Sequence, residues 1–142
     1  ILTKLYLTDM KQKDKGQILN VASIAGFMPG PLMATYYATK AYVVRLSEAI
    51  REELKKEKSN VKISILCPGP VDTNFNNVAD VEFSIKGLSS KYVAKYAVKK
   101  LEKNKFYIVP GFSIKCAKIG AKIAPTGLVS KISYKMQKRK IK

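Results

Sequence analysis

Two short apolar runs with one long amphipathic segment between them constrain the fold of this chain most strongly. Residues 18–22 and 61–67 are apolar enough to form strands buried on both faces of a sheet. Residues 34–58 carry apolar side chains at near-helical spacing, with charged side chains elsewhere, and predict a helix. Buried strands joined through a helix are typical of parallel sheets, so the sequence predicts an α/β fold.

The rest of the chain is divided by clear sequence signals. Residues 1–10 predict an amphipathic helix that is already under way at the first residue. The Gly and Pro content of residues 24–35 predicts a loop. Ser89 is a plausible N-cap for a helix that continues to about residue 103, and residues 105–110 predict a final strand.

A serine, a tyrosine and a lysine follow the first predicted strand at short intervals. Ser23 stands at the C-terminal end of that strand, where ligands bind in open α/β sheets. Tyr36 and Lys40 are four positions apart in the predicted helix, so their side chains share one face and can act on the same bound molecule. We therefore treat these three residues as the candidate site.

A proline- and glycine-rich turn ends the second predicted strand. Pro68 and Gly69 must stop the strand, and Val71 and Thr73 follow directly. Cys67, immediately before the turn, is most simply a small buried residue. An ordinary strand-to-loop turn would have the same composition, so by itself this segment does not indicate a function.

Three motifs taken together indicate a family. The residues Asn20-x-x-Ser23, Tyr36-x-x-x-Lys40 and Pro68-Gly69-x-Val71-x-Thr73 resemble the second half of a short-chain dehydrogenase/reductase, over about residues 1–110. The resemblance implies the C-terminal portion of a doubly wound, Rossmann-type parallel sheet. It also implies an oxidoreductase that uses NAD or NADP to interconvert a ketone and a secondary alcohol.

The resemblance assigns a role to each candidate residue. Tyr36 would supply or take the proton of the reacting oxygen, and Lys40 would stabilise the phenolate because a tyrosine phenol is ordinarily protonated at neutral pH. Ser23 would hold the substrate oxygen by a hydrogen bond. The residues implied to contact the cofactor are Tyr36, Lys40, Pro68, Gly69, Val71 and Thr73.

Several of these residues could instead have a purely structural role. Tyr36 could be an aromatic residue that packs at the start of a helix, and the adjacent Tyr37 is better explained by a structural role. Asn20 is best explained by hydrogen bonding at the end of the strand.

Motifs that the family carries in its first half are absent from these 142 residues. They are a glycine-rich turn for the cofactor pyrophosphate, an Asn-Asn-Ala-Gly segment and a catalytic Asn before the Ser strand. We therefore expect a C-terminal piece of a longer protein that is inactive alone. A protein that keeps the fold without catalysis, or a basic peripheral membrane- or nucleic-acid-binding protein, is the alternative.

Apolar side chains surround the two motif-bearing loops and could line a substrate cleft. An apolar lining would favour a hydrophobic ketone or alcohol, whereas the same side chains could equally form the core or a subunit contact. The residues in question are Phe27, Met28, Leu32, Met33, Phe75 and Phe83.

Composition excludes several classes of function. The chain has 27 Lys and Arg against 10 Asp and Glu, a net charge of +17, but only three of the cations are Arg. Because base reading relies on the bidentate Arg fork, this balance argues against specific nucleic-acid recognition. The chain has no His, and Cys67 and Cys116 lack C-x-x-C spacing, so we expect no metal site and a reducing, cytoplasmic compartment.

The segment 111–142 forms a predicted basic, amphipathic helical extension to the domain at 1–110. It contains nine basic residues and no acidic one, and its longest uncharged run, 123–130, is far short of the roughly 20 residues that span a bilayer. Such a helix could lie on an anionic membrane surface or cover the substrate cleft as a solvated helix. By resemblance, the helices predicted at 1–10 and 34–58 would pair subunits in a homo-oligomer.

Overall fold

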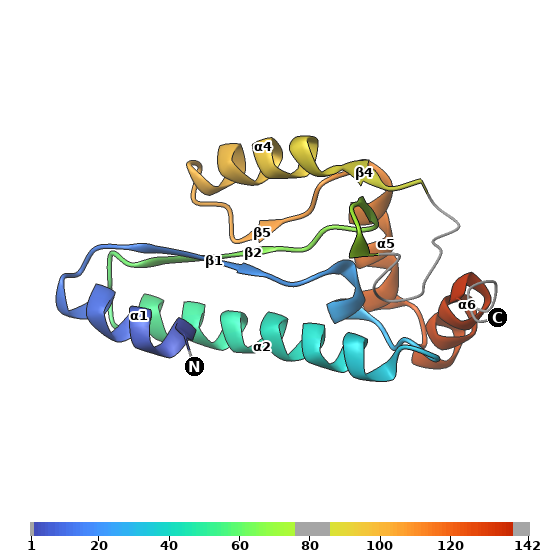
Figure 1. Ribbon diagram of the computed structural model, residues 1–142. Helices are drawn as coiled ribbons and strands as arrows, with labels where there is room; N and C mark the ends of the chain where they lie inside the picture. The colour runs from blue at the N-terminus through green and yellow to red at the C-terminus, as the bar shows by residue number, and fades with distance from the viewer. Residues whose placement is uncertain (1, 76–85, 138–142) are drawn as a thin grey trace.

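The computed structural model describes residues 2–75 and 86–137 of the chain. Figure 1 shows three layers: helices α1 (Leu2–Gln12) and α2 (Ala34–Lys56) cover one face of a central sheet, and α4 (Ser90–Leu101) covers the other. The chain ends in α5 (Phe112–Ile123) and α6 (Thr126–Gln137).

The sheet is parallel, as the sequence predicts. Its strands are β1 (Gln17–Val21), β2 (Lys62–Leu66) and β5 (Tyr107–Ile108), in the order β1-β2-β5. Two further short strands, β3 (Val71–Asp72) and β4 (Leu88–Ser89), pair with each other in parallel. The α/β fold is thus confirmed.

The helix predictions at the start and middle of the chain hold to within about three residues at either end. Ser89 caps α4 as predicted, and its side chain accepts a hydrogen bond from Tyr92 N. The predicted loop at 24–35 contains a short 3₁₀ helix, η1 (Ile24–Phe27), which forms because the Ser23 side chain accepts the backbone N–H of Ala25. The predicted helical tail consists of two helices, which separate at Ala124 and Pro125 because proline cannot continue the hydrogen-bond ladder.

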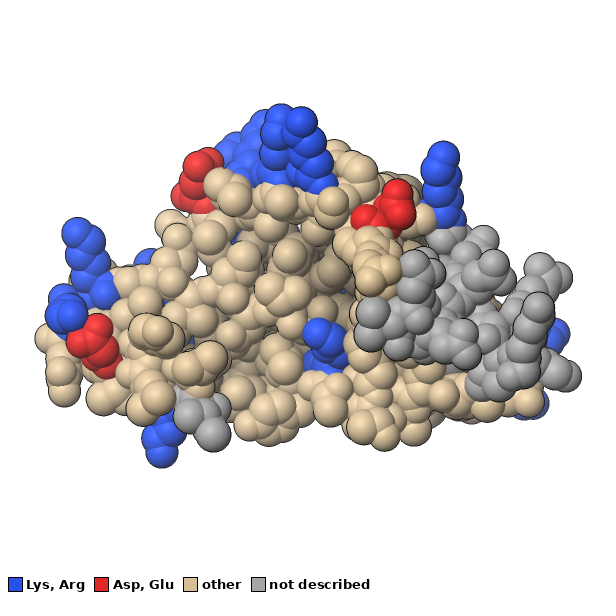
Figure 2. Space-filling model, viewed as in Figure 1, with Lys and Arg blue, Asp and Glu red and all other residues tan. Residues whose placement is uncertain are grey.

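Strand β2 is buried and β1 is only half-buried, although the sequence predicts burial for both. Ile65 and Cys67 have no exposed surface, whereas Val21 is 57% exposed. The reason is position: β2 lies between two neighbours, and β1 lies at the edge of the described sheet. Figure 2 shows that the surface over β1 is almost free of charged side chains.

Asn20 on β1 forms hydrogen bonds with side chains of both α1 and α2. Its side-chain NH₂ donates to Ser47 Oγ at 2.8 Å, and its Oδ1 accepts from Thr3 Oγ1 at 3.2 Å. Ser47 in turn donates to the carbonyl of Val43 at 2.8 Å. The predicted hydrogen-bonding role of Asn20 is therefore confirmed, and it joins β1 to both α1 and α2.

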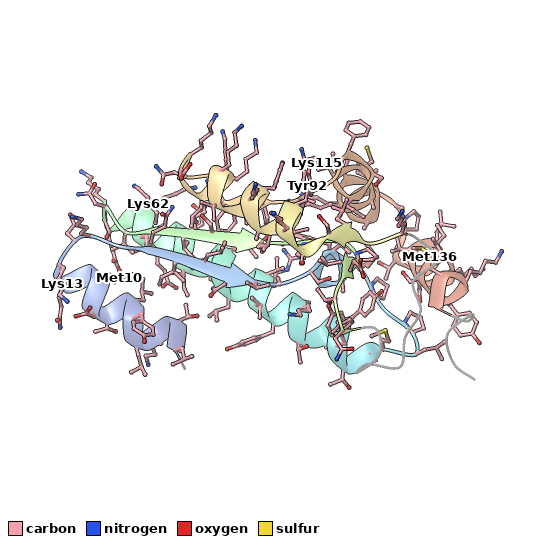
Figure 3. All side chains as sticks on the ribbon, turned by 45° about the horizontal axis from the view of Figure 1, so that its top comes forward. Met10, Lys13, Lys62, Tyr92, Lys115 and Met136 are labelled. Carbon is pink, nitrogen blue, oxygen red and sulfur yellow. The ribbon has the colours of Figure 1, made fainter. Side chains whose placement is uncertain are left out.

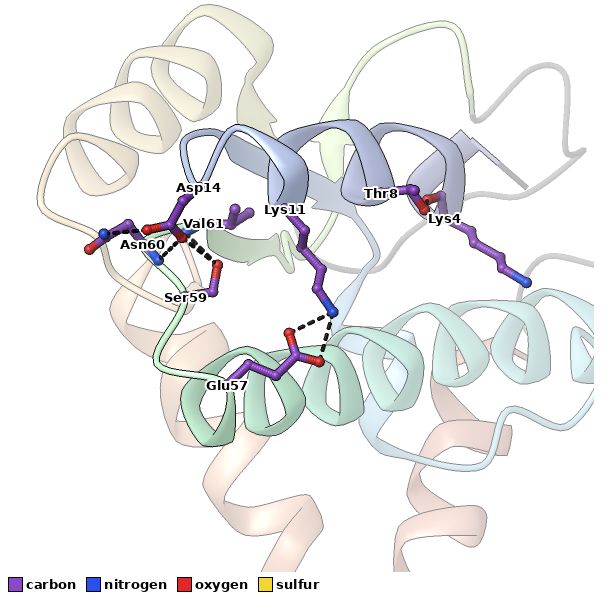
Figure 4. A network of polar contacts seen from close by, with 8 residues as sticks. All are labelled: Lys4, Thr8, Lys11, Asp14, Glu57, Ser59, Asn60 and Val61. Atoms are coloured by element: carbon purple, nitrogen blue, oxygen red, sulfur yellow. Dashed lines mark hydrogen bonds and ion pairs between the residues drawn. The ribbon is translucent and has the colours of Figure 1, made fainter.

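Asp14 links the turn before β1 to the turn before β2 (Figure 4). Its carboxylate accepts three hydrogen bonds, from Ser59 Oγ, Asn60 N and Asn60 Nδ2, at 3.0, 2.8 and 2.7 Å. Nearby, Lys11 Nζ donates to Glu57 Oε1 at 2.7 Å. Because Asp14 precedes β1 and Ser59 and Asn60 precede β2, the carboxylate aligns the starts of the two strands.

Helix α5 packs onto the core through one face. Ile114 is buried in the same cluster as Ile65, and a Cβ atom at Gly69 would lie only 2.5 Å from Ile114 Cδ1. Lys118 lies over the ring of Tyr107, with Nζ 3.1 Å from the centroid. Figure 3 labels Lys115 on the same helix, Tyr92 on α4 and Met136 on α6. The boundary at 110/111 stays a prediction.

We predict that the Asp14→Asn variant lowers stability only while the wild-type carboxylate is ionised. The hydrogen bond from the backbone N–H of Asn60, followed by those from the Asn60 and Ser59 side chains, lowers the pKa of Asp14 in the folded chain. A lowered folded pKa contributes stability above the unfolded pKa, and this contribution is lost as the pH falls through the folded pKa. The urea midpoint of the variant should therefore lie below that of the wild type at neutral pH, and this difference should disappear at acidic pH.

The matched control is Asp9→Asn, which removes an exposed i,i+4 ion pair with Lys13. It should change the urea midpoint little at any pH. A difference for Asp14→Asn that stays constant from neutral to acidic pH would contradict the assignment of the effect to carboxylate ionisation.

We also predict an energetic coupling between Gly69 and Ile114. Gly69→Ala places a methyl against the buried Ile114 side chain, which should cost roughly 1–3 kcal/mol. Ile114→Val removes the nearest carbon and by itself should cost about 0.5–1.5 kcal/mol. Because the second change makes room for the first, the double variant should lose less stability than the sum of the single variants, as measured by a double-mutant cycle of chemical denaturation. Additive losses of unfolding free energy would show that the Ile114 side chain does not contact the turn at Gly69.

Candidate active site

A pocket of about 130 Å³ lies at the C-terminal ends of β1 and β2, beside the start of α2. Parallel strands present their carboxyl ends along one edge of the sheet, which brings together segments that are far apart in the sequence. Six of the seven candidate catalytic and cofactor-contacting residues line this pocket: Ser23, Tyr36, Pro68, Gly69, Val71 and Thr73.

Ser23 is buried and is held at the junction of the two strand ends. Its Oγ accepts from Ala25 N at 3.2 Å and lies 3.4 Å from the carbonyl of Pro68, to which it donates. The same carbonyl accepts Ile24 N at 2.9 Å. The Ser23 hydroxyl contact is long for an O–H···O hydrogen bond, so this proton can turn toward another oxygen in the pocket at little cost.

Tyr36 stands in the first turn of α2 and presents its half-buried ring to the pocket. The ring lies 5.5 Å from that of Phe75 and 6.0 Å from that of Tyr37, both centroid to centroid. Tyr36 therefore packs against aromatic neighbours and also lines the pocket, so the packing interpretation of this residue does not exclude a place in the site.

Lys40 lies one helical turn beyond Tyr36 and is not part of the pocket wall. Its Nζ is 5.7 Å from the centroid of the Tyr36 ring and donates to the carbonyl of Val21 at 3.3 Å. The strand-end carbonyl thus holds the ammonium group beside the tyrosine. This arrangement puts a positive charge where it would stabilise a phenolate.

The turn after β2 forms the opposite wall of the pocket. Thr73 Oγ1 accepts from Phe75 N at 3.3 Å, which leaves the hydroxyl proton of Thr73 available to donate. The carbonyl of Pro70 accepts from Leu88 N at 3.0 Å, and this contact fixes the end of the turn to β4.

The structure places only some of the predicted apolar lining residues in the pocket wall. Met33 and Phe75 line the pocket. Phe27 does not: it packs against the core, 5.8 Å from the ring of Tyr107, so the core alternative is correct for this residue. Leu32 is exposed and Met28 is not part of the pocket wall. Phe83 lies outside the described residues.

Sequence analysis missed several residues of the pocket wall. They are Ala22, Ile24, Ala25, Tyr37 and Pro70. Each is a direct neighbour in sequence of a predicted site residue or lies one turn from it. Tyr37 also meets Gly30 so closely that any side chain at Gly30 would clash with its ring, which supports a structural role for Tyr37.

A polar cluster that the sequence did not indicate lies behind the pocket, between α2, β5 and α5. The hydroxyl of Tyr107 donates to the carboxylate of Glu48, and Lys118 lies over the Tyr107 ring. Burial lowers the pKa of Lys118 and raises the pKa of the Cys67 thiol to about 12. Cys67 is therefore a protonated, buried side chain, as predicted, and not a nucleophile.

The described residues contain neither a cluster of metal ligands nor a membrane-spanning helix. In residues 2–75 and 86–137 no group of three or more His, Cys, Asp or Glu is placed to hold a metal ion. None of the helices in this part of the chain combines the length and apolar character needed to cross a bilayer.

Comparison with known proteins gives the pocket a context. The family model described as short chain dehydrogenase matches residues 1–82. The very-long-chain 3-oxoacyl-CoA reductase of Laccaria bicolor is 43% identical over 61 residues, which are 43% of this chain and 18% of that protein. The ketoacyl reductase HetN of Nostoc sp. is 36% identical over 107 residues, 73% of this chain and 36% of that protein.

Solved structures share the fold. A short chain dehydrogenase from Burkholderia cenocepacia, in complex with NADP, superposes with a TM-score of 0.72 at 23% identity, covering 88% of this chain and 50% of that one. The chain therefore spans half or less of the length of these relatives. Since the family model covers more than half of the 142 residues, this chain belongs to the short-chain dehydrogenase family.

Proposed function

We propose that the whole protein is an NAD- or NADP-dependent oxidoreductase that interconverts a hydrophobic ketone and a secondary alcohol, with Ser23, Tyr36 and Lys40 as its catalytic residues. One observation carries the proposal. Ser23 and Tyr36 come from different elements and line the same pocket, and Lys40 lies against the Tyr36 ring.

The pocket fits one end of a dinucleotide. About 130 Å³ has room for a single ring with its substituents and is far below the volume that encloses a ligand of dinucleotide size. The backbone of Val71 and the hydroxyl of Thr73 would hold the carboxamide of that ring, above the turn at Pro68 and Gly69. The Burkholderia cenocepacia relative is in complex with NADP, which supports NAD or NADP as the cofactor. When bound, the cofactor supplies or accepts the hydride.

Tyr36 would transfer the proton at the substrate oxygen. Reduction of a carbonyl needs a proton on oxygen, and the reverse oxidation needs the hydroxyl proton removed. The ammonium of Lys40, held by the carbonyl of Val21, would stabilise the phenolate that forms when Tyr36 gives up its proton.

Ser23 would position the substrate oxygen. Its hydroxyl now donates to the Pro68 carbonyl over a long 3.4 Å contact, and the substrate oxygen is a better-placed acceptor once it enters the pocket. The chain has no His to activate Ser23 as a nucleophile, so its contribution is orientation and electrostatic stabilisation.

The substrate side of the pocket favours an apolar molecule. Met33 and Phe75 border Tyr36 there, and carbon surface of this kind binds hydrocarbon better than charged groups. The name of the Laccaria bicolor relative, a very-long-chain 3-oxoacyl-CoA reductase, supports the same substrate class.

Two further proposals concern assembly and compartment. Leu2, Leu5 and Tyr6 on α1 and Tyr42 on α2 are exposed by 60% or more, and we propose that they pair subunits in a homo-oligomer. Both cysteines are free thiols, which supports a reducing, cytoplasmic compartment.

We predict that Tyr36→Phe abolishes turnover in the full-length protein while cofactor binding persists. Loss of the phenol removes the proton-transfer group, which should reduce kcat by roughly 10²–10⁴-fold. The measurement is the change in nicotinamide absorbance with NADH and NADPH against a panel of apolar ketones, with cofactor affinity measured separately by titration.

The matched control is Tyr92→Phe, which removes the same hydroxyl from an exposed tyrosine on α4, outside the pocket and the proposed subunit contact, and should leave kcat within a factor of two. Turnover that survives Tyr36→Phe would refute the assigned mechanism. A wild-type protein that binds neither cofactor would shift the interpretation to a binding protein that keeps the fold without catalysis.

A further inference from the structure

Helix α5 is apolar on two opposite sides, and only one of them is used by the fold. Ile114 packs on Gly69, and Lys118 lies over the Tyr107 ring, so this side faces the core. The opposite side carries apolar residues at positions i, i+4, i+7 and i+11, which fall within one narrow stripe of a helix. We call this set the outer stripe; it consists of Phe112, Cys116, Ile119 and Ile123.

The outer stripe is uncovered in the described structure. Phe112 is 81% exposed, Ile119 59% and Ile123 78%. Because Ile114 and Lys118 hold the inner side in place, α5 cannot rotate to bury the stripe without giving up these core contacts. Large, contiguous apolar side chains left in water on a fixed helix mark a binding surface.

The charged residues of α5 that border this surface are both lysines. Lys115 and Lys122 flank the outer stripe along one side of α5, and both are exposed. Lys115 Nζ also lies 5.8 Å from the ring centroid of Tyr96 on α4. No acidic residue occurs anywhere between positions 111 and 142, so nothing in this segment neutralises the lysines.

Helix α6 repeats the combination. Val129 and Ser133 are its buried residues, while Leu128 and Ile132 remain about half exposed. Lys131 and Lys135 lie on the exposed side of the same helix. In the described residues of α5 and α6, exposed apolar side chains therefore lie beside charged side chains that are all lysines.

We propose that the outer stripe of α5, with Lys115 and Lys122, binds the surface of an anionic lipid bilayer, with α5 lying in the plane of the interface. Apolar side chains enter the acyl boundary, and lysines at the edge pair with anionic headgroups. The inference is independent of the proposed reaction.

Charge selects this occupant over two others. A second copy meeting the same surface about a two-fold axis would bring lysines against lysines, which repel. Nucleic acid would pair with the lysines but offers no hydrocarbon layer for Phe112, Ile119 and Ile123. A bilayer satisfies both requirements at once. Since Ile114 of the same helix contacts Gly69 in the pocket wall, the bilayer and the pocket would lie on opposite sides of a helix about 10 Å thick.

Co-sedimentation with lipid vesicles tests the proposal on the full-length protein. The wild type should sediment with vesicles of phosphatidylcholine and phosphatidylserine, bind weakly to phosphatidylcholine alone, and lose affinity as salt rises. The triple variant Phe112→Ser, Ile119→Ser, Ile123→Ser keeps the charge and should bind at least roughly tenfold more weakly. The double variant Lys115→Gln, Lys122→Gln keeps the stripe and should also lose roughly tenfold or more.

Matched controls use α4, which carries four lysines against three on α5. Val98→Ser removes an apolar side chain that is 54% exposed, and Lys95→Gln, Lys99→Gln removes two exposed lysines. Both should leave binding to the anionic vesicles within a factor of two. Because all substituted side chains are exposed, circular dichroism and the thermal midpoint should show every variant folded.

Five outcomes would overturn the proposal. The wild type could fail to bind anionic vesicles, or the α4 controls could lose as much affinity as the α5 variants. The serine variants could retain full binding, which would reduce the contact to diffuse electrostatics. Finally, light scattering could show a dimer that the serine variants dissociate, or a DNA gel shift could depend on the stripe, which would identify another occupant.

Discussion

The parallel register between β1 and β2 is the constraint on which the rest of the structure depends. Val21 pairs with Leu66, and Ala22 N donates to the Leu66 carbonyl at 2.8 Å, so the two strands end at the same level. The chain leaving each strand then places Ser23 beside Pro68. A slip by one residue would turn every side chain of the shifted strand to the other face of the sheet and would separate the serine from the turn that closes its pocket.

The site combines one local relation with one long-range relation. Tyr36 and Lys40 are neighbours because four residues make one helical turn, and this relation needs no other part of the protein. Their approach to Ser23 and Thr73 needs the sheet, the crossing helix and the turn after β2. The helix therefore sets the spacing between Tyr36 and Lys40. The position of this pair relative to Ser23 depends on how α2 packs on β1 and β2. The hydrogen bond between Asn20 and Ser47 reinforces that packing.

β1 is half-buried because the described residues form only three strands of a doubly wound sheet, and α5 packs at the other side of these strands. In the described sheet β1 has one neighbour and an open edge with few charged side chains, which fits a chain that spans half or less of its relatives. At the other side, β5 is short and α5 supports the turn at Gly69 through Ile114. The helix that stabilises the pocket wall is thus also the helix with an uncovered apolar side.

The sequence by itself determined the parallel α/β class, the main helices, the cap at Ser89 and the spacing of Tyr36 and Lys40. These depend on periodicity, capping and turn chemistry, which act over a few residues. Only the tertiary structure decided that Phe27 belongs to the core, that Ile114 supports Gly69 and that β1 is an edge. Each of these is a contact, or the lack of one, between segments far apart in the chain, and no local pattern records which surfaces meet once the strands have paired.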